Sequence, residues 1–317
     1  MKKVYAYLIG ACICILICMT IVAITYRNRI YAWTLGDVPA LYEKATSLYK
    51  SRQYQEALPL FEQLAKLDTA AYCKFLLGDL HYRGLAGEVD YKKALALFEE
   101  AAELNNTSAH NNLGIMYLMG QGVQADYSKA FTNFQYGAIN GNPHAQVGLG
   151  TMYRHGWGTV RNSSAAFDWY RRAAAHNNVD AMNNLGYMYA SGLGINMNAE
   201  SAFYWYQKAA ALNHPKAQYN IGALYAEGRG VKRDLQKCAE WLTKAALQGE
   251  ATAQFNLGNM YFLGKGVERD LDKAAMWYEL AKEQGHRNAS RFLNLLEKYQ
   301  EIAELDSNFV IHLIPEK

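Results

Sequence analysis

A glycine recurs every 36 residues through most of this chain, and each of these glycines follows a Leu or an Ile. The series is Gly78, Gly114, Gly150, Gly186, Gly222 and Gly258. A fixed period of this length predicts an array of stacked units in which each unit packs only on its neighbours. Such arrays present long surfaces, so we expect a protein that binds other molecules rather than one that performs chemistry.

Each period carries the signals of two helices joined by a glycine turn. Further glycines follow the first by six and, in most copies, eight residues, which marks a helix end and a turn. Twelve residues after the first glycine stands an Asp or Asn, a residue type that accepts free N–H groups at the start of a second helix. These predicted caps are Asp90, Asp126, Asn162, Asn198, Asp234 and Asp270.

The second helix is predicted by its apolar face and by its end. A small residue, Ala or Cys, is followed four positions later by Phe, Tyr or Leu in every copy, which is helical spacing. The helix then meets a Gly or Asn, the residues that best accept a left-handed conformation. These predicted ends are Asn105, Gly141, Asn177, Asn213, Gly249 and Gly285.

The copies share Ala-x-x-Asn-Leu-Gly-x-Met-Tyr, then Gly-x-Gly-Val, then Lys-Ala-x-x-Trp-Tyr-x-Lys-Ala-Ala, a pattern clearest between Ala253 and Ala281. This pattern resembles the Sel1-like repeat, a relative of the tetratricopeptide repeat with a longer loop between its helices. The resemblance implies an all-α, right-handed α-solenoid of antiparallel helix pairs. Six repeats would cover residues 73–288, after a tetratricopeptide-like hairpin at 34–72 and before a capping helix at 289–303 and a tail at 304–317.

The N-terminal segment, residues 1–33, is predicted to anchor the chain in a membrane. From Val4 to Thr25 there are 22 residues without a charge, and a helix of that length spans about 33 Å, enough for a bilayer core of about 30 Å. A cleaved signal is disfavoured by the bulky Ile21 near the best cleavage point, and lipidation at Cys12 remains an alternative. Two basic residues stand on each side, so the free amino terminus favours a cytoplasmic N-terminus and repeats on the periplasmic or extracytoplasmic side.

Charge and motif spacing exclude several classes of function. The net charge is +3, and four positive residues flank the apolar run, which leaves 3 − 4 = −1 for the body and no footprint for nucleic acid. The Gly-x-Gly turns lack the Gly-Lys-Ser/Thr ending of a phosphate loop, so no nucleotide or other cofactor is expected. The eight histidines show no metal-binding spacing, and we interpret most of them as exposed or loop residues.

Partner binding is predicted along the exposed face of the first helices, which in related arrays lines the concave side of the solenoid. This face, which we call the first-helix stripe, follows i, i+4, i+7 spacing and varies between copies while the Leu-Gly framework does not. Its candidate binding residues are Ile115, Leu118, Val147, Arg154, Tyr187, Tyr219, Phe255, Asn259 and Phe262. The stripe also holds small residues, including Ala223 and Ala226. An alternative is that these side chains only fill gaps between neighbouring helices.

The sequence therefore predicts a membrane-tethered, non-catalytic scaffold or adaptor that binds a partner protein or peptide. Two other functions remain open. One is a hydrolase acting on β-lactams or the cell wall, because some cysteine-rich Sel1-like proteins are linked to β-lactams; those members carry a cysteine pair in each repeat, and this chain does not. The other is a structural protein that assembles with copies of itself.

Overall fold

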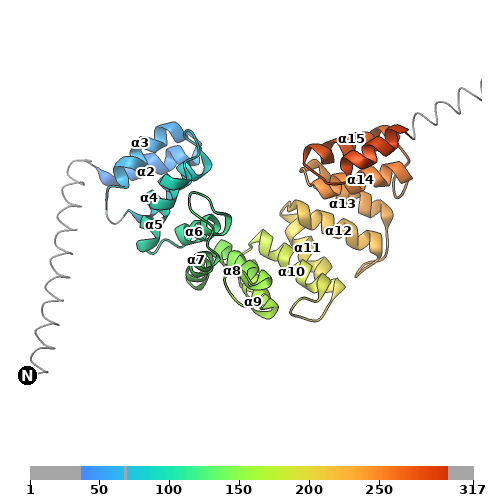
Figure 1. Ribbon diagram of the computed structural model, residues 1–317, viewed down its shortest axis with the longest axis horizontal. Coiled ribbons are helices and arrows are strands. Elements are labelled where there is room, and N and C mark those ends of the chain that lie inside the picture. Colours follow the sequence, from blue (N-terminus) through green and yellow to red (C-terminus); the bar gives the residue numbers. More distant parts are fainter. Residues whose placement is uncertain (1–36, 68–69, 299–317) are drawn as a thin grey trace, which may run out of the picture. The chain divides into compact units, whose positions relative to one another are not determined.

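The computed structural model describes residues 37–67 and 70–298, and these residues form consecutive helical hairpins (Figure 1). Each hairpin has a first and a second helix. In chain order they are α2 (Val38–Lys50) and α3 (Tyr54–Leu64), α4 (Ala71–Arg83) and α5 (Tyr91–Glu103), α6 (Thr107–Met119) and α7 (Tyr127–Ile139), α8 (Pro143–His155) and α9 (Ser163–Ala175), α10 (Val179–Ser191) and α11 (Ala199–Ala211), α12 (Pro215–Glu227) and α13 (Leu235–Leu247), and α14 (Ala251–Leu263) and α15 (Leu271–Glu283). A further helical stretch runs from 289 to 298.

The chain divides into two compact units. One unit ends at Arg161 and contains α2 to α8, and the other begins at Asn162 and contains α9 to α15. Within each unit every helix packs on the next one in sequence. The described residues are thus an all-helical repeat array, as the 36-residue period predicts.

The predicted helix starts are confirmed by the cap geometry. The side-chain oxygen at each cap accepts the N–H of the third residue beyond it, at 2.8 to 3.0 Å. Each such bond satisfies one of the N–H groups that the first helical turn leaves without a partner. The predicted helix ends are confirmed as well, because all six of these Gly and Asn residues have φ between 58° and 87°.

The period-setting glycines let the two helices of a hairpin approach closely. A Cβ added at Gly186 would lie 2.5 Å from the ring of Tyr206, and one at Gly258 would lie 2.7 Å from the ring of Tyr278. Both tyrosines are buried. Any side chain at these glycines would therefore collide with the aromatic residue that fills the hairpin core.

The glycine of the inter-helix loop is required by contact with the preceding repeat. Gly230 has φ +70°, and a Cβ there would lie 2.5 Å from the backbone of Ala199, at the start of α11. Gly194 meets Ser163 in the same way. The long loop of each repeat therefore lies against the start of the second helix one repeat earlier, and only glycine permits that distance.

Several predictions concern residues beyond the described part of the chain. Within residues 37–67 and 70–298 no helix is long and apolar enough to cross a membrane. The predicted anchor at 4–25 and the tail at 304–317 lie outside those residues. The predicted capping segment is helical from 289 to 298, where the described chain ends, and its Ala289 and Leu296 are buried against the last hairpin.

Candidate functional site

The first-helix stripe is divided between the two units. The unit ending at Arg161 carries its candidate residues on α6 and α8, and all of them are half-buried: Ile115, Leu118, Val147 and Arg154. The other unit carries its candidates on α10, α12 and α14: Tyr187, Tyr219, Phe255, Asn259 and Phe262. Tyr187 is the most open of these, with 42% of its surface exposed.

A cavity of about 320 Å³ opens between α12 and α14. Its walls are the stripe side of these two first helices, and its buried side is formed by the second helix between them, α13. The lining residues are Tyr219, Ala223, Ala226 and Glu227 from α12, Leu235, Cys238 and Leu242 from α13, Asn256, Asn259, Met260 and Leu263 from α14, and Lys265. Of the nine predicted binding residues, the cavity brings together Tyr219 and Asn259.

The cavity exists because α12 has alanine at two successive stripe positions. Ala223 and Ala226 occupy the places where α6 carries Ile115 and Leu118. Small side chains at both places leave the apolar side chains of α13, such as Leu242, facing an open space. Most of the predicted binding residues are bulky, whereas the residues that create this site, Ala223 and Ala226, are small.

The polar groups of the cavity are held by neighbouring helices. The Oδ1 atom of Asn259 accepts a hydrogen bond from the Tyr278 hydroxyl of α15 at 2.8 Å. The amide of Asn256 donates to the Tyr219 hydroxyl at 3.5 Å, a long contact. Burial raises the pKa of Tyr219, so its hydroxyl stays protonated at neutral pH and is able to donate a hydrogen bond to a bound group.

The thiol of Cys238 is the nucleophilic atom nearest this cavity, and its surroundings keep it unreactive. Burial raises its pKa to about 11, so the thiolate that a nucleophile requires is scarce at neutral pH. Its Sγ lies 3.8 Å from the sulfur of Met260. In the described part of the chain no three His, Cys, Asp or Glu side chains form a group that could hold a metal. The arrangement is suited to binding an apolar side chain beside a few polar anchors.

Phe255 does not belong to the open surface, so the exposure expected for this stripe residue is not found. Its ring is 9% exposed and stacks on the ring of His286 at a centroid distance of 4.3 Å. It also meets Phe292 edge to face at 5.0 Å. The residues at and after the end of the last repeat supply both partners, so the end of the array buries a position that is half-buried on the helices before it.

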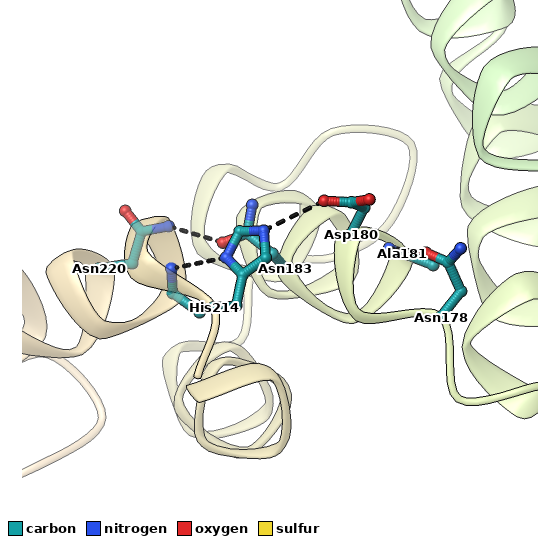
Figure 2. A network of polar contacts seen from close by, with 7 residues as sticks. Asn178, Asp180, Ala181, Asn183, His214 and Asn220 are labelled. Carbon is teal, nitrogen blue, oxygen red and sulfur yellow. Dashed lines mark hydrogen bonds and ion pairs between the residues drawn. The ribbon is translucent and has the colours of Figure 1, made fainter. Parts of the chain in front are cut away.

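A polar network ties α12 to α10 (Figure 2). The Nδ1 atom of His214 accepts the backbone N–H of Ala217 at 3.1 Å, so this histidine is the N-cap of α12. Its Nε2 lies 3.2 Å from Oδ1 of Asp180 on α10. Asn220 donates to Asn183 at 3.1 Å one turn further along.

His214 is therefore a structural residue, because it ends the loop before α12 and caps that helix. The position of His214 in its repeat could have revealed this role. The equivalent position in the three preceding repeats holds Asn106, Asn142 and Asn178, and each of these also caps a first helix. Since Nδ1 accepts a hydrogen bond, the ring proton of the neutral form must sit on Nε2, where it can be donated to Asp180.

Comparison with known proteins finds the same repeat. A family model for the Sel1 repeat matches residues 107–142, 143–178, 179–214, 215–250 and 251–286, more than half of the chain. A tetratricopeptide repeat model matches residues 42–109. The predicted first copy, which begins at residue 73, thus falls within the tetratricopeptide match. A search of curated proteins found no match.

Solved structures of bacterial repeat proteins are similar to this chain. A Sel1 repeat protein from Oxalobacter formigenes is 36% identical over 67% of this chain and 85% of its own, with a TM-score of 0.62. The protein c5321, a protective antigen present in uropathogenic Escherichia coli strains, is 29% identical with a TM-score of 0.64. The match covers 82% of this chain and 59% of that protein.

Proposed function

The chain belongs to the Sel1 repeat family, and we propose that it is a membrane-tethered scaffold that binds a partner protein or peptide at the cavity between α12 and α14. Sel1 repeat proteins are generally protein-interaction scaffolds, and the uncharged run from Val4 to Thr25 supports the tether. The observation that carries the proposal is the cavity beside Ala223 and Ala226, whose buried side is lined by apolar side chains of α13.

The cavity suits a partner segment with one large apolar side chain. Its depth is formed by Leu242, Cys238 and Met260, which are buried, while Glu227 and Lys265 at its edge are exposed. An apolar side chain that enters such a site contributes about 1.5–3 kcal/mol through burial. The hydroxyl of Tyr219 and the amide of Asn256 are placed to pair with the polar backbone of the same segment.

The test fills the cavity without touching its polar groups. Ala226→Leu adds apolar bulk inside the cavity, and Ala190→Leu adds the same bulk at the equivalent position of α10, which does not line it. Tagged full-length chains are crosslinked in membranes of the source cell, and captured proteins are quantified by mass spectrometry. We expect a partner that is retained by the parent chain and by Ala190→Leu and lost from Ala226→Leu. Equal capture by both variants, with equal helicity, would rule out the cavity.

We also propose that the repeats lie on the periplasmic or extracytoplasmic side of the membrane. The free amino terminus adds one positive charge to an otherwise even balance around the apolar run, which favours a cytoplasmic N-terminus. Protease added to sealed right-side-out vesicles is expected to digest the repeats, and inverted vesicles are expected to protect them; the reverse pattern would overturn the orientation.

A further inference from the structure

A second apolar pocket, of about 300 Å³, lies at the N-terminal end of the array. It is formed where the starts of α2 and α4 meet the end of α3. Its lining residues are Val38, Pro39, Tyr42, Leu64, Leu67, Ala70, Tyr72 and Cys73. Leu64 and Cys73 are buried, whereas Tyr42 and Tyr72 are exposed by 38% and 49%. The pocket therefore has an apolar floor and an open aromatic rim.

Two features of the first hairpin leave this pocket uncovered. The helix α3 has 11 residues, whereas the second helices of the later hairpins have 13. Within the described residues no hairpin precedes α2, so its outer side lacks the neighbour that every later first helix has. Contiguous apolar surface of this kind is typical of a site where another segment packs.

The sequence that directly precedes the pocket wall is itself apolar. The described residues begin at Asp37, and the next two residues, Val38 and Pro39, already form the pocket wall. Residues 30–35 read Ile-Tyr-Ala-Trp-Thr-Leu, four of them large and apolar. Val38 follows Trp33 by five positions, a reach of up to about 18 Å in extended chain.

We propose that this pocket is the docking site of residues 30–36, with the Trp33 side chain filling it. Covalent attachment gives the segment a millimolar or higher effective concentration at the pocket, which no free partner matches. An indole on an apolar floor, with its N–H toward the open rim, is the arrangement that buried tryptophans favour.

The docked segment joins the proposed anchor to the repeats. Val4 to Thr25 ends only a few residues before Ile30, so docking holds the α2–α3 hairpin next to the membrane surface instead of leaving it on a free linker. This inference does not depend on partner binding at the α12–α14 cavity, since the two sites lie in different units.

Two cysteines provide a matched measurement of whether the pocket is covered. Cys73 lies in this pocket, and Cys238 lies in the α12–α14 cavity; each is 4% exposed. The full-length chain in detergent is treated with iodoacetamide, and both labelling rates are read by peptide mass spectrometry. We expect Cys73 to react more slowly than Cys238 in the parent chain. Trp33→Ala is expected to raise the Cys73 rate about tenfold, while Cys238 serves as the unchanged reference and Trp33→Phe keeps most of the protection.

The outcomes separate the possible occupants. A Cys73 rate that does not change in Trp33→Ala overturns the proposal. A rate in the parent chain that falls as chain concentration rises would instead indicate a second copy in the pocket. If Trp33→Ala also lowers the thermal midpoint of unfolding, a crosslinking experiment tests the docking instead. A short bismaleimide is expected to link the cysteine of Trp33→Cys to Cys73 within one chain. The same reagent is expected not to link the cysteine of Arg27→Cys to Cys73. Absence of the first link overturns the docking.

Discussion

The glycine that sets the 36-residue period can be tested by comparing two equivalent positions. Gly186 in α10 faces the Tyr206 ring, and a Cβ there would lie 2.5 Å from Cδ1. Gly222 in α12 faces Leu242, and its Cβ would lie 3.2 Å from Cδ2. Ordinary van der Waals contact begins near 3.4 Å. Alanine at 186 thus requires the ring to retreat by about 0.9 Å, against about 0.2 Å for the leucine.

The two substitutions should differ by about 1–2 kcal/mol. Replacing glycine by alanine in a helix interior contributes about 0.8–1.0 kcal/mol of stability, and overpacking a core costs about 1–3 kcal/mol. Tyr206 is 3% exposed, so its rigid ring has no space to enter, and we expect Gly186→Ala to lose about 1–2 kcal/mol. Leu242 can rotate, so Gly222→Ala should be close to neutral.

The measurement is urea unfolding followed by circular dichroism on the full-length chain in detergent. Because arrays unfold by parts, hydrogen exchange in α10 and α11 gives the local value. The double variant Gly186→Ala, Tyr206→Leu should be about as stable as Tyr206→Leu alone, since it places alanine opposite leucine as in Gly222→Ala. If Gly186→Ala were as stable as Gly222→Ala, close helix approach would not be the reason for the period.

Three other predictions follow from caps, loops and thiols. His214→Ala should lose about 1 kcal/mol in urea unfolding, and His214→Asn should retain the cap; equal losses would refute the capping role. Gly230→Ala should disrupt the array far more than Gly249→Ala, because both have positive φ but only Gly230 meets backbone at 2.5 Å; comparable thermal midpoints would refute this. Iodoacetamide labelling of Cys73 and Cys238 should rise about tenfold per pH unit between pH 7 and 10, since burial raises both pKa values to about 11; a plateau near pH 8 would contradict it.

Local sequence patterns are sufficient to predict the helices, but they are insufficient to predict the candidate binding site. Asp234 and Asn213 act through bonds to residues next to them, so their types alone identify a cap and a helix end. Phe255 has the spacing of a stripe residue, yet its burial depends on His286 and Phe292, about 30 or more residues later. His214 caps a helix although histidine is seldom chosen for that place, so only comparison with the other repeats could reveal it.

The repeat itself explains why binding specificity is hard to deduce from spacing. Framework positions such as Gly222 and Leu242 are constrained by each other in every copy, so they recur and can be recognised. Stripe positions are constrained only by the side chains that pack beside them. The cavity forms where two consecutive stripe residues, Ala223 and Ala226, are both small and lie over apolar side chains of α13. Each alanine by itself is an ordinary helix residue. The site is thus a property of the pair and the floor together, and a substitution that fills it, such as Ala226→Leu, should change binding while leaving the framework that folds the array intact.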